Sequence, residues 1–183
     1  MQKKIFPLSE VYRLLEPGPV VLLTTARVGR PNVMPMSWHL MMEFTPPLVG
    51  CVVSSGNYSF ASLKASRECV INIPTVELAK IVVACGNVTG QSVDKCKTFG
   101  LTALPAKFVK APLIAECYAS LESKVVDMKL VTKYNFFVLE VIHAWVDPAR
   151  KKPRTIHHQG EGEFMVSGRT LHLPSPKTSL GGK

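Results

Sequence analysis

Polar side chains follow two apolar stretches and recur in a later helical stretch. They are Asn32, Ser37, Ser54, Ser55, Asn57, Tyr58, Ser59, Ser92 and Lys95. Each has an ordinary structural explanation, because Asn and Ser are common in turns and a Lys beside an Asp often forms a solvated ion pair. As a set, their hydroxyls and the N–H groups of a helix start could bind a phosphate-bearing ligand. Met34, Met36 and Trp38 could form a wall for a flat aromatic ring.

Other kinds of chemistry lack their usual motifs. The sequence has no GxGxxG after a strand, no GxxxxGK[ST] phosphate loop and no GxSxG nucleophile elbow. None of the five histidines has the spacing of a metal site, and neighbouring His157 and His158 on a strand would point to opposite faces. Hydrolase chemistry is therefore disfavoured, and we predict no metal site.

The totals indicate one globular domain. The 183 residues are 46% hydrophobic and 19% charged, which favours a single folded domain over residues 1–183, with a loose tail from about residue 174. No apolar run approaches the ~20 residues of a membrane-spanning helix, and no secretory signal is visible. Five cysteines, an odd number without a CxxC motif, favour buried thiols and the cytoplasm.

The chain is basic, with 22 Lys and Arg against 13 Asp and Glu and a net charge of +9. Apart from the RKKPR run at residues 150–154, the basic residues are spread thinly. No recognition helix, zinc-finger spacing or aromatic RNA-binding strand accompanies them, so small anionic cofactors or substrates are favoured over nucleic acid.

The elements that must position these residues are mostly strands. A hairpin is predicted from residues 20–26 and 32–38 around Gly29, and Pro35 predicts that its second strand is an edge or is irregular. Further strands are expected after Pro47, at residues 68–74, in two long stretches at 116–130 and 134–147, and in two or three short ones across 154–160 and 163–173, with a tight turn at 167–169. Helices are expected at 9–18, 57–67, 76–86 and 92–100, the last capped by Ser92 and ended by Gly100. This order favours a closed or nearly closed antiparallel barrel with outer helices.

Five segments, in this order and spacing, resemble one known family. They are GRPNVMPMSW (29–38), PPLVGCVVSSGNYSFASL (46–63), ECVINIP (68–74), GQSVDKCKTFGL (90–101) and FFVLEV (136–141), together about two-thirds of the chain. This set is similar to the flavin reductase-like, FMN-binding split-barrel proteins, which include the flavoredoxins. The resemblance implies a mainly β fold: an antiparallel Greek-key split barrel with short flanking helices, acting as a homodimer with FMN near the subunit interface.

The resemblance also implies roles for particular residues. Asn32, Met36, Ser37 and Trp38 would contact the flavin ring, and Ser54, Ser55, Asn57, Tyr58 and Ser59 would bind the ribityl chain and phosphate. Ser92 and Lys95 would approach the flavin, where the Lys95 cation would favour the negatively charged reduced form. Further candidates for the cofactor site are Met34, Pro35, Tyr134 and His158.

The chain departs from the family pattern at four positions. Pro35 stands where the family often has Thr or Ala, Asn57 where it has Thr, Tyr134 where His is common, and Leu139 where Gly is usual. We expect Pro35 to disrupt strand pairing and free neighbouring backbone groups for the flavin edge. The other changes affect the fine contacts and the access of a nicotinamide to the flavin.

The leading functional prediction is an enzyme, a flavin reductase that takes hydride from NADH or NADPH and passes electrons to free flavin or a partner protein. Such chemistry needs no catalytic acid or base, which agrees with the missing motifs. A flavoredoxin-type electron carrier reduced by a partner protein is the alternative. A basic barrel that binds nucleic acid is a distant third.

Overall fold

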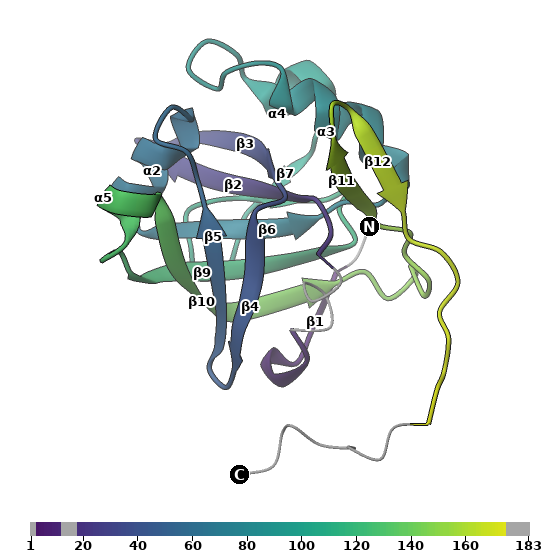
Figure 1. Ribbon diagram of the computed structural model, residues 1–183. Coiled ribbons are helices and arrows are strands. Elements are labelled where there is room, and N and C mark those ends of the chain that lie inside the picture. The colour runs from purple at the N-terminus through teal and green to yellow at the C-terminus, as the bar shows by residue number, and fades with distance from the viewer. Residues whose placement is uncertain (1–2, 12–17, 175–183) are drawn as a thin grey trace.

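The computed structural model describes residues 3–11 and 18–174 (Figure 1). Its strands are β1 (Lys4–Ile5), β2 (Val21–Arg27), β3 (Arg30–Met36), β4 (His39–Phe44), β5 (Pro47–Val52), β6 (Glu68–Ile73), β7 (Ala103–Leu104), β8 (Leu113–Ile114), β9 (Ala119–Asp127), β10 (Phe136–Val146), β11 (Ile156–Gly160) and β12 (Glu163–Val166). Its helices are the 3₁₀ turns η1 (Leu8–Glu10) and η2 (Val76–Leu78) and the α-helices α2 (Tyr58–Ser66), α3 (Ala79–Gly86), α4 (Lys95–Phe99) and α5 (Val131–Tyr134).

One antiparallel sheet forms the body of the molecule. Its strand order is β3-β2-β6-β9-β10-β5-β4, with β1 added against β10, while β11 and β12 pair separately, as do β7 and β8. β3 and β4 are the two edges of this order, although only Ser37 and Trp38 separate them in the sequence. The sheet curls into a barrel that is open between these two strands. This confirms the predicted split-barrel fold with short flanking helices.

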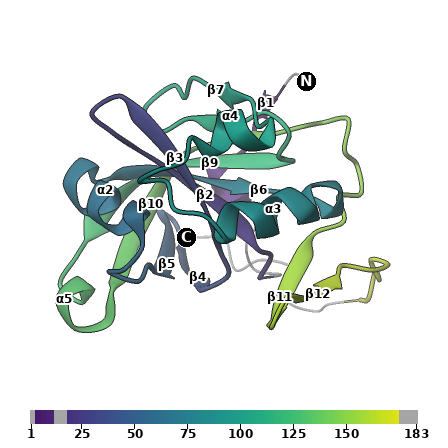
Figure 2. The same ribbon diagram turned by 90° about the horizontal axis from the view of Figure 1, so that it is seen from above.

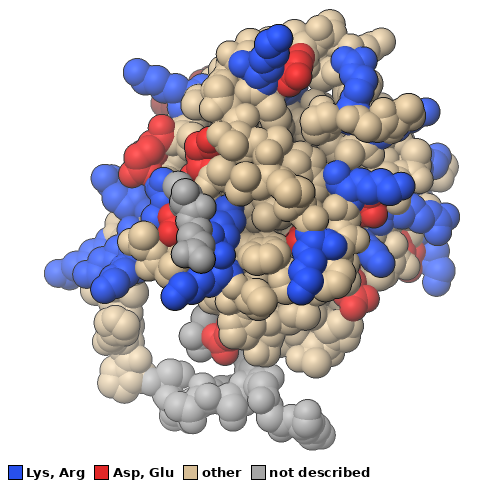
Figure 3. All heavy atoms as spheres, turned by 180° about the vertical axis from the view of Figure 1, so that it is seen from behind, with Lys and Arg blue, Asp and Glu red and all other residues tan. Residues whose placement is uncertain are grey.

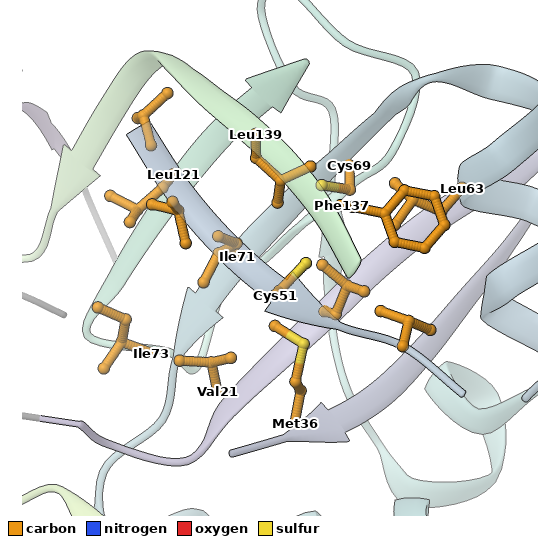
Figure 4. Packing of buried hydrophobic residues seen from close by; sticks show 14 of the residues in the cluster. Val21, Met36, Cys51, Leu63, Cys69, Ile71, Ile73, Leu121, Phe137 and Leu139 are labelled. Carbon is orange, nitrogen blue, oxygen red and sulfur yellow. The ribbon is translucent and has the colours of Figure 1, made fainter. Parts of the chain in front are cut away.

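The barrel interior is apolar because its central strands bury every second side chain. Val21 and Leu23 of β2, Ile71 of β6, Leu121 of β9 and Leu139 of β10 are fully buried in one cluster. Figure 4 shows these strands directing such side chains towards a common centre. Burial of each Leu or Ile side chain contributes about 2 kcal/mol to the free energy of folding, so these contacts together stabilise the curled sheet.

A second apolar layer covers the outside of β2 and β3. Leu22 and Val33 pack there with Val82 of α3, Cys96 of α4 and Ile156 of β11. Figure 2 shows α3 beside the β11–β12 hairpin. Because β2 is buried on both faces, it reads as a nearly continuous apolar run in the sequence. None of the helices in the described part of the chain is long and apolar enough to cross a membrane.

Most of the predicted elements between residues 20 and 100 are confirmed. The hairpin, the helix after Asn57, the strand from residue 68 and the end of α4 at Gly100, which has a φ of 66°, all occur. β3 is an edge strand, as Pro35 predicts, but pairing with β2 runs without a register shift from Arg30 to Met36. The expectation that Pro35 disrupts the pairing is therefore wrong. Because an edge strand has a neighbouring strand on one side only, a residue without an N–H can stand there without loss of a hydrogen bond to a second strand.

Other expectations need correction. Ser92 does not cap α4; Asp94 does, because its Oδ1 accepts the Lys97 N–H at 3.1 Å, while the Ser92 N–H bonds back to Thr89. The turn expected at 167–169 is absent, and residues 167–174 form no helix or strand. The hairpin instead turns at residues 161–162. β4 was not predicted. Most of the expected 9–18 helix, and the tail from residue 175, lie outside the described residues.

Candidate functional site

A cavity of about 880 Å³ lies where β3 ends and the chain crosses to β4. One wall is formed by β3 and the two residues that follow it: Asn32, Met34, Pro35, Met36, Ser37 and Trp38. Met36 also belongs to the barrel core, where Figure 4 shows its side chain pointing inwards. The Trp38 ring is 72% exposed, so it stands at the rim of the cavity.

The second wall is the junction of β5 and α2. Val52, Ser54, Gly56, Asn57, Tyr58 and Ser59 line it. Asn57 is the N-terminal cap residue of the nine-residue α2, yet its side chain makes no capping hydrogen bond. Among the described residues, the N–H groups of the first helical turn therefore have no capping side chain at the cavity wall. A helix start in this state attracts anions.

The third wall is the loop between α3 and α4, with α5 opposite. The loop contributes Asn87, Val88, Thr89 and Gly90, the end of α3 contributes Cys85 and Gly86, and the start of α4 contributes Lys95, while α5 with its following residue contributes Lys133, Tyr134 and Asn135. The stretch 87–90 was not predicted as part of a site. Its composition, Asn-Val-Thr-Gly after a helix-ending Gly86, is the only sequence signal for it, and such a signal is typical of any loop.

Asn32 is the most constrained polar side chain of the site. It is 5% exposed, and its Nδ2 donates to Ser59 Oγ at 2.7 Å. Its Oδ1 has no hydrogen-bond partner among the described residues. Gly90 packs so closely against this oxygen that an added Cβ would meet Oδ1 first and lie 2.5 Å from Asn32 Cγ. Asn32 is thus held on two sides, with one buried acceptor left for a ligand that can donate a hydrogen bond.

Two lysines give the cavity a positive potential. Lys95 is 6% exposed, and its Nζ donates to the Cys85 carbonyl oxygen at 2.7 Å. Burial lowers the pKa of Lys95, an effect that the nearby Cys85 thiol partly opposes. Lys133 is exposed on the other side of the cavity. No Asp or Glu of the described residues lines the cavity, so the site suits an anionic ligand.

The structure brings together most of the predicted site residues, but three lie elsewhere. Ser55 does not line the cavity, although Ser54 and Gly56 on either side of it do. Ser92, in the loop before α4, is not among the residues that line it either. His158 lines a separate, neighbouring cavity. Tyr134 does line the main cavity, beside Lys133 and Asn135, which were not predicted.

Comparison with known proteins agrees with this architecture. The family model described as flavin reductase like domain matches residues 13–163. The chain therefore belongs to the flavin reductase-like family, which confirms the resemblance drawn from its motifs.

Individual relatives extend this result. An uncharacterized protein of Archaeoglobus fulgidus is 35% identical over 74% of this chain and 77% of its own. The uncharacterized protein YddH of Escherichia coli is 30% identical over 90% and 94%. Among solved structures, an FMN-binding domain of a flavin reductases-like enzyme from Shewanella baltica has a TM-score of 0.87 at 26% identity, covering 94% of this chain and 98% of that one. A flavoredoxin from Methanosarcina acetivorans has a TM-score of 0.72 at 27% identity, covering 87% and 89%.

Proposed function

We propose that the protein is an FMN-dependent flavin reductase that uses NADH or NADPH as its reductant. The observation that carries this proposal is the 880 Å³ cavity of a flavin reductase-like chain, lined by two lysines and without an acidic side chain. The solved relative from Shewanella baltica, described as an FMN-binding domain, supports the choice of flavin.

The residues present fit FMN. The buried Asn32 Oδ1 is free to accept a hydrogen bond, and FMN carries donors in its ring imide and its ribityl hydroxyls. The start of α2 with Ser54, Asn57, Tyr58 and Ser59, together with a lysine, would hold the phosphate. Met34, Ser37 and Trp38 would border the ring.

FMN, when bound, supplies the hydride and electron transfer itself. The chain's part is to bind, orient and bias the cofactor. Lys95 would act through its charge, because a buried ammonium close to the cofactor stabilises added negative charge. Its hydrogen bond to Cys85 fixes the ammonium on the α3 side of the cavity.

The test begins with a visible spectrum of freshly purified protein, followed by identification of any released chromophore. We expect FMN, bound at purification or taken up when added. Anaerobic mixing with NADH or NADPH should then remove the flavin absorbance within seconds. Protein that remains colourless with excess FMN would refute the proposal.

The same experiment separates the second candidate, a flavoredoxin-type electron carrier. The similarity to the Methanosarcina acetivorans flavoredoxin favours it specifically. In that case the flavin absorbance would persist with both nicotinamides and disappear only when a reducing partner protein is added.

We also propose that the protein is a homodimer of the cytoplasm. The open edge strand β4 and its surroundings expose Trp38, Leu40, Met42 and Tyr134 at 72%, 52%, 45% and 55%. Burying this apolar surface against a second copy would stabilise a dimer. The mass measured by light scattering should be twice that of one chain. Leu40→Glu should reduce this mass, whereas Val126→Glu should not, because Val126 is similarly exposed, at 50%, but lies on β9. The five cysteines are all free and buried, which supports a reducing compartment.

A further inference from the structure

The segment between β10 and β11 is the densest run of basic residues in the chain. Residues 147–154 read DPARKKPR and hold four cations, Arg150, Lys151, Lys152 and Arg154, against one carboxylate, Asp147. In Figure 1 this segment lies on the right of the molecule. Figure 3, seen from behind, shows Lys and Arg side chains gathered on the corresponding left side. None of these residues lines the flavin cavity.

Arg150 holds this segment against the body of the protein. Its Nη1 donates to Thr75 Oγ1 at 2.9 Å, and its Nε lies 3.5 Å from Asp147 Oδ2. Asp147 is itself buried, at 4% exposed. At the other end of the segment, the Arg154 carbonyl oxygen accepts the Val76 N–H at 2.8 Å. Because the segment is anchored at both ends, a partner that binds to it would lose little affinity to the ordering of this backbone.

The other three cations of the segment point into solvent. Lys151, Lys152 and Arg154 are exposed, and none of them forms an ion pair with another of the described residues. The carboxylates of Glu77 and Asp147 lie 3.4 Å and 3.5 Å from the guanidinium nitrogens of Arg150 instead. The three exposed side chains, which we call the basic loop surface, therefore keep their positive charge for a partner.

One short helix connects the basic loop surface to the flavin cavity. Val76, which bonds to Arg154, opens η2, and η2 leads directly into α3. α3 ends at Gly86, which lines the cavity. Its eight residues span about 12 Å. A protein docked on the basic loop surface would therefore lie about one helix length from the cavity.

The composition of the segment favours a protein over other polyanions. Single-stranded nucleic acid is bound with aromatic side chains that stack on bases, and residues 147–154 contain none. A membrane surface is bound by an apolar face beside the basic one, whereas the apolar residues of this segment are only Ala149 and two prolines. An acidic protein face needs complementary charges in a fixed arrangement, which the anchored segment supplies.

We propose that the basic loop surface docks a redox protein through an acidic face of that protein. The proposal rests on the proposed function for the redox character of the partner, since both a reductase and an electron carrier must meet the protein with which they exchange electrons. The complementary charges would speed the encounter, and the affinity would fall as salt is added.

The probe is an acidic plant-type [2Fe–2S] ferredoxin, titrated by calorimetry into FMN-loaded and FMN-free protein. At low ionic strength we expect binding that weakens as salt is added. Lys151→Glu/Lys152→Glu should weaken this binding about tenfold, because it reverses two of the three charges. The matched control is Lys64→Glu/Lys97→Glu, which changes the net charge equally at two exposed lysines on α2 and α4. The control should keep the affinity within about twofold of that of the unmodified protein.

Each outcome decides the proposal. Equal weakening by the two double variants would refute it, because only the net charge would then matter. Absence of ferredoxin binding at low ionic strength would refute it as well, and so would tighter binding of a single-stranded oligonucleotide or of phosphatidylserine vesicles through the same two lysines. Melting curves check that each variant is folded, and Lys151→Ala/Lys152→Ala, which should weaken ferredoxin binding about threefold, repeats the test without added acidic groups. If FMN itself does not bind, the proposed function fails, while the titration of FMN-free protein still tests the docking surface.

Discussion

Replacing Gly90 by Ala tests whether the loop between α3 and α4 holds Asn32 in place. Gly90 does not have a positive φ, so Ala brings no backbone strain there. The added Cβ would nevertheless lie closest of all to Asn32 Oδ1, 2.5 Å from Asn32 Cγ and 3.2 Å from its Nδ2. Because real Cβ contacts are longer than 3.0 Å, the Asn32 side chain must move.

The cost has two parts. Forcing Asn32 out of its rotamer costs about 0.5–1.5 kcal/mol. Breaking its 2.7 Å hydrogen bond to Ser59 in a buried setting costs about 1–3 kcal/mol more. A loss of about 3 kcal/mol lowers the melting temperature of a chain of this size by roughly 6–12 °C. FMN affinity should fall at least fivefold, because the free acceptor Oδ1 moves with the side chain.

Thermal unfolding with and without FMN, and FMN titration by fluorescence, measure both effects. Gly56→Ala is the control on the same cavity, since its added Cβ would be 3.8 Å from Ser54 Oγ, an ordinary contact. The variants Asn32→Ala and Asn32→Ala/Gly90→Ala complete a double-mutant cycle. In the Asn32→Ala background, Gly90→Ala should cost less than about 1 kcal/mol, because the opposing amide is gone.

The reasoning would be refuted if Gly90→Ala were as costly in that background as in the unmodified protein. A Gly90→Ala variant that melts within 1 °C of the unmodified protein would refute it equally.

Three other perturbations follow from buried charges. Lys95→Met should weaken FMN binding about tenfold. Because burial lowers the pKa of Lys95, the FMN affinity of the unmodified protein should fall at a lower alkaline pH than it would with an ordinary lysine. FMN titrations of the variant should show no such fall. Burial lowers the pKa of Lys3 from 10.5 to about 8, so as the pH rises the folded state loses this proton before the unfolded state does. The free energy of unfolding should therefore rise between about pH 8 and 10.5, by up to about 3 kcal/mol. Lys3→Met should abolish this rise when urea unfolding is measured across that range. Glu122 is fully buried and accepts hydrogen bonds from the backbone N–H groups of residues 107–108 and from Trp145 Nε1. Glu122→Gln should therefore lower the free energy of unfolding in urea by about 2–3 kcal/mol. An unchanged urea midpoint of unfolding would contradict this account.

The strands and helices with strong local patterns could be predicted from the sequence. β2 (VLLTTAR) and β6 (ECVINI) are rich in apolar and β-branched residues, and Gly100 ends α4 in the left-handed region. β4 was not predictable in this way, because its sequence, HLMMEF, shows no regular alternation of polar and apolar residues. It is a strand because β5 supplies hydrogen-bond partners along its length.

The cap of α4 illustrates a finer limit. Ser92 and Asp94 are both good cap residues, and the sequence alone does not distinguish them. The turn that bonds Ser92 N–H to Thr89 delays the start of the helix, and this leaves Asp94 in the capping position. A local choice of two residues was thus decided by how the preceding loop folds.

The sequence by itself determined the family, the barrel strands other than β4, and the polar segments at residues 32–38 and 54–59, because these depend on residue types at short spacing. Only the tertiary structure decided which of those side chains share a cavity. It brought Gly90 against Asn32 from 58 positions away in the chain, left Ser55 and Ser92 off the lining of the main cavity, and placed His158 on a second cavity. The physical reason is that a cavity forms between elements distant in sequence, so its walls depend on long-range packing that no local pattern encodes.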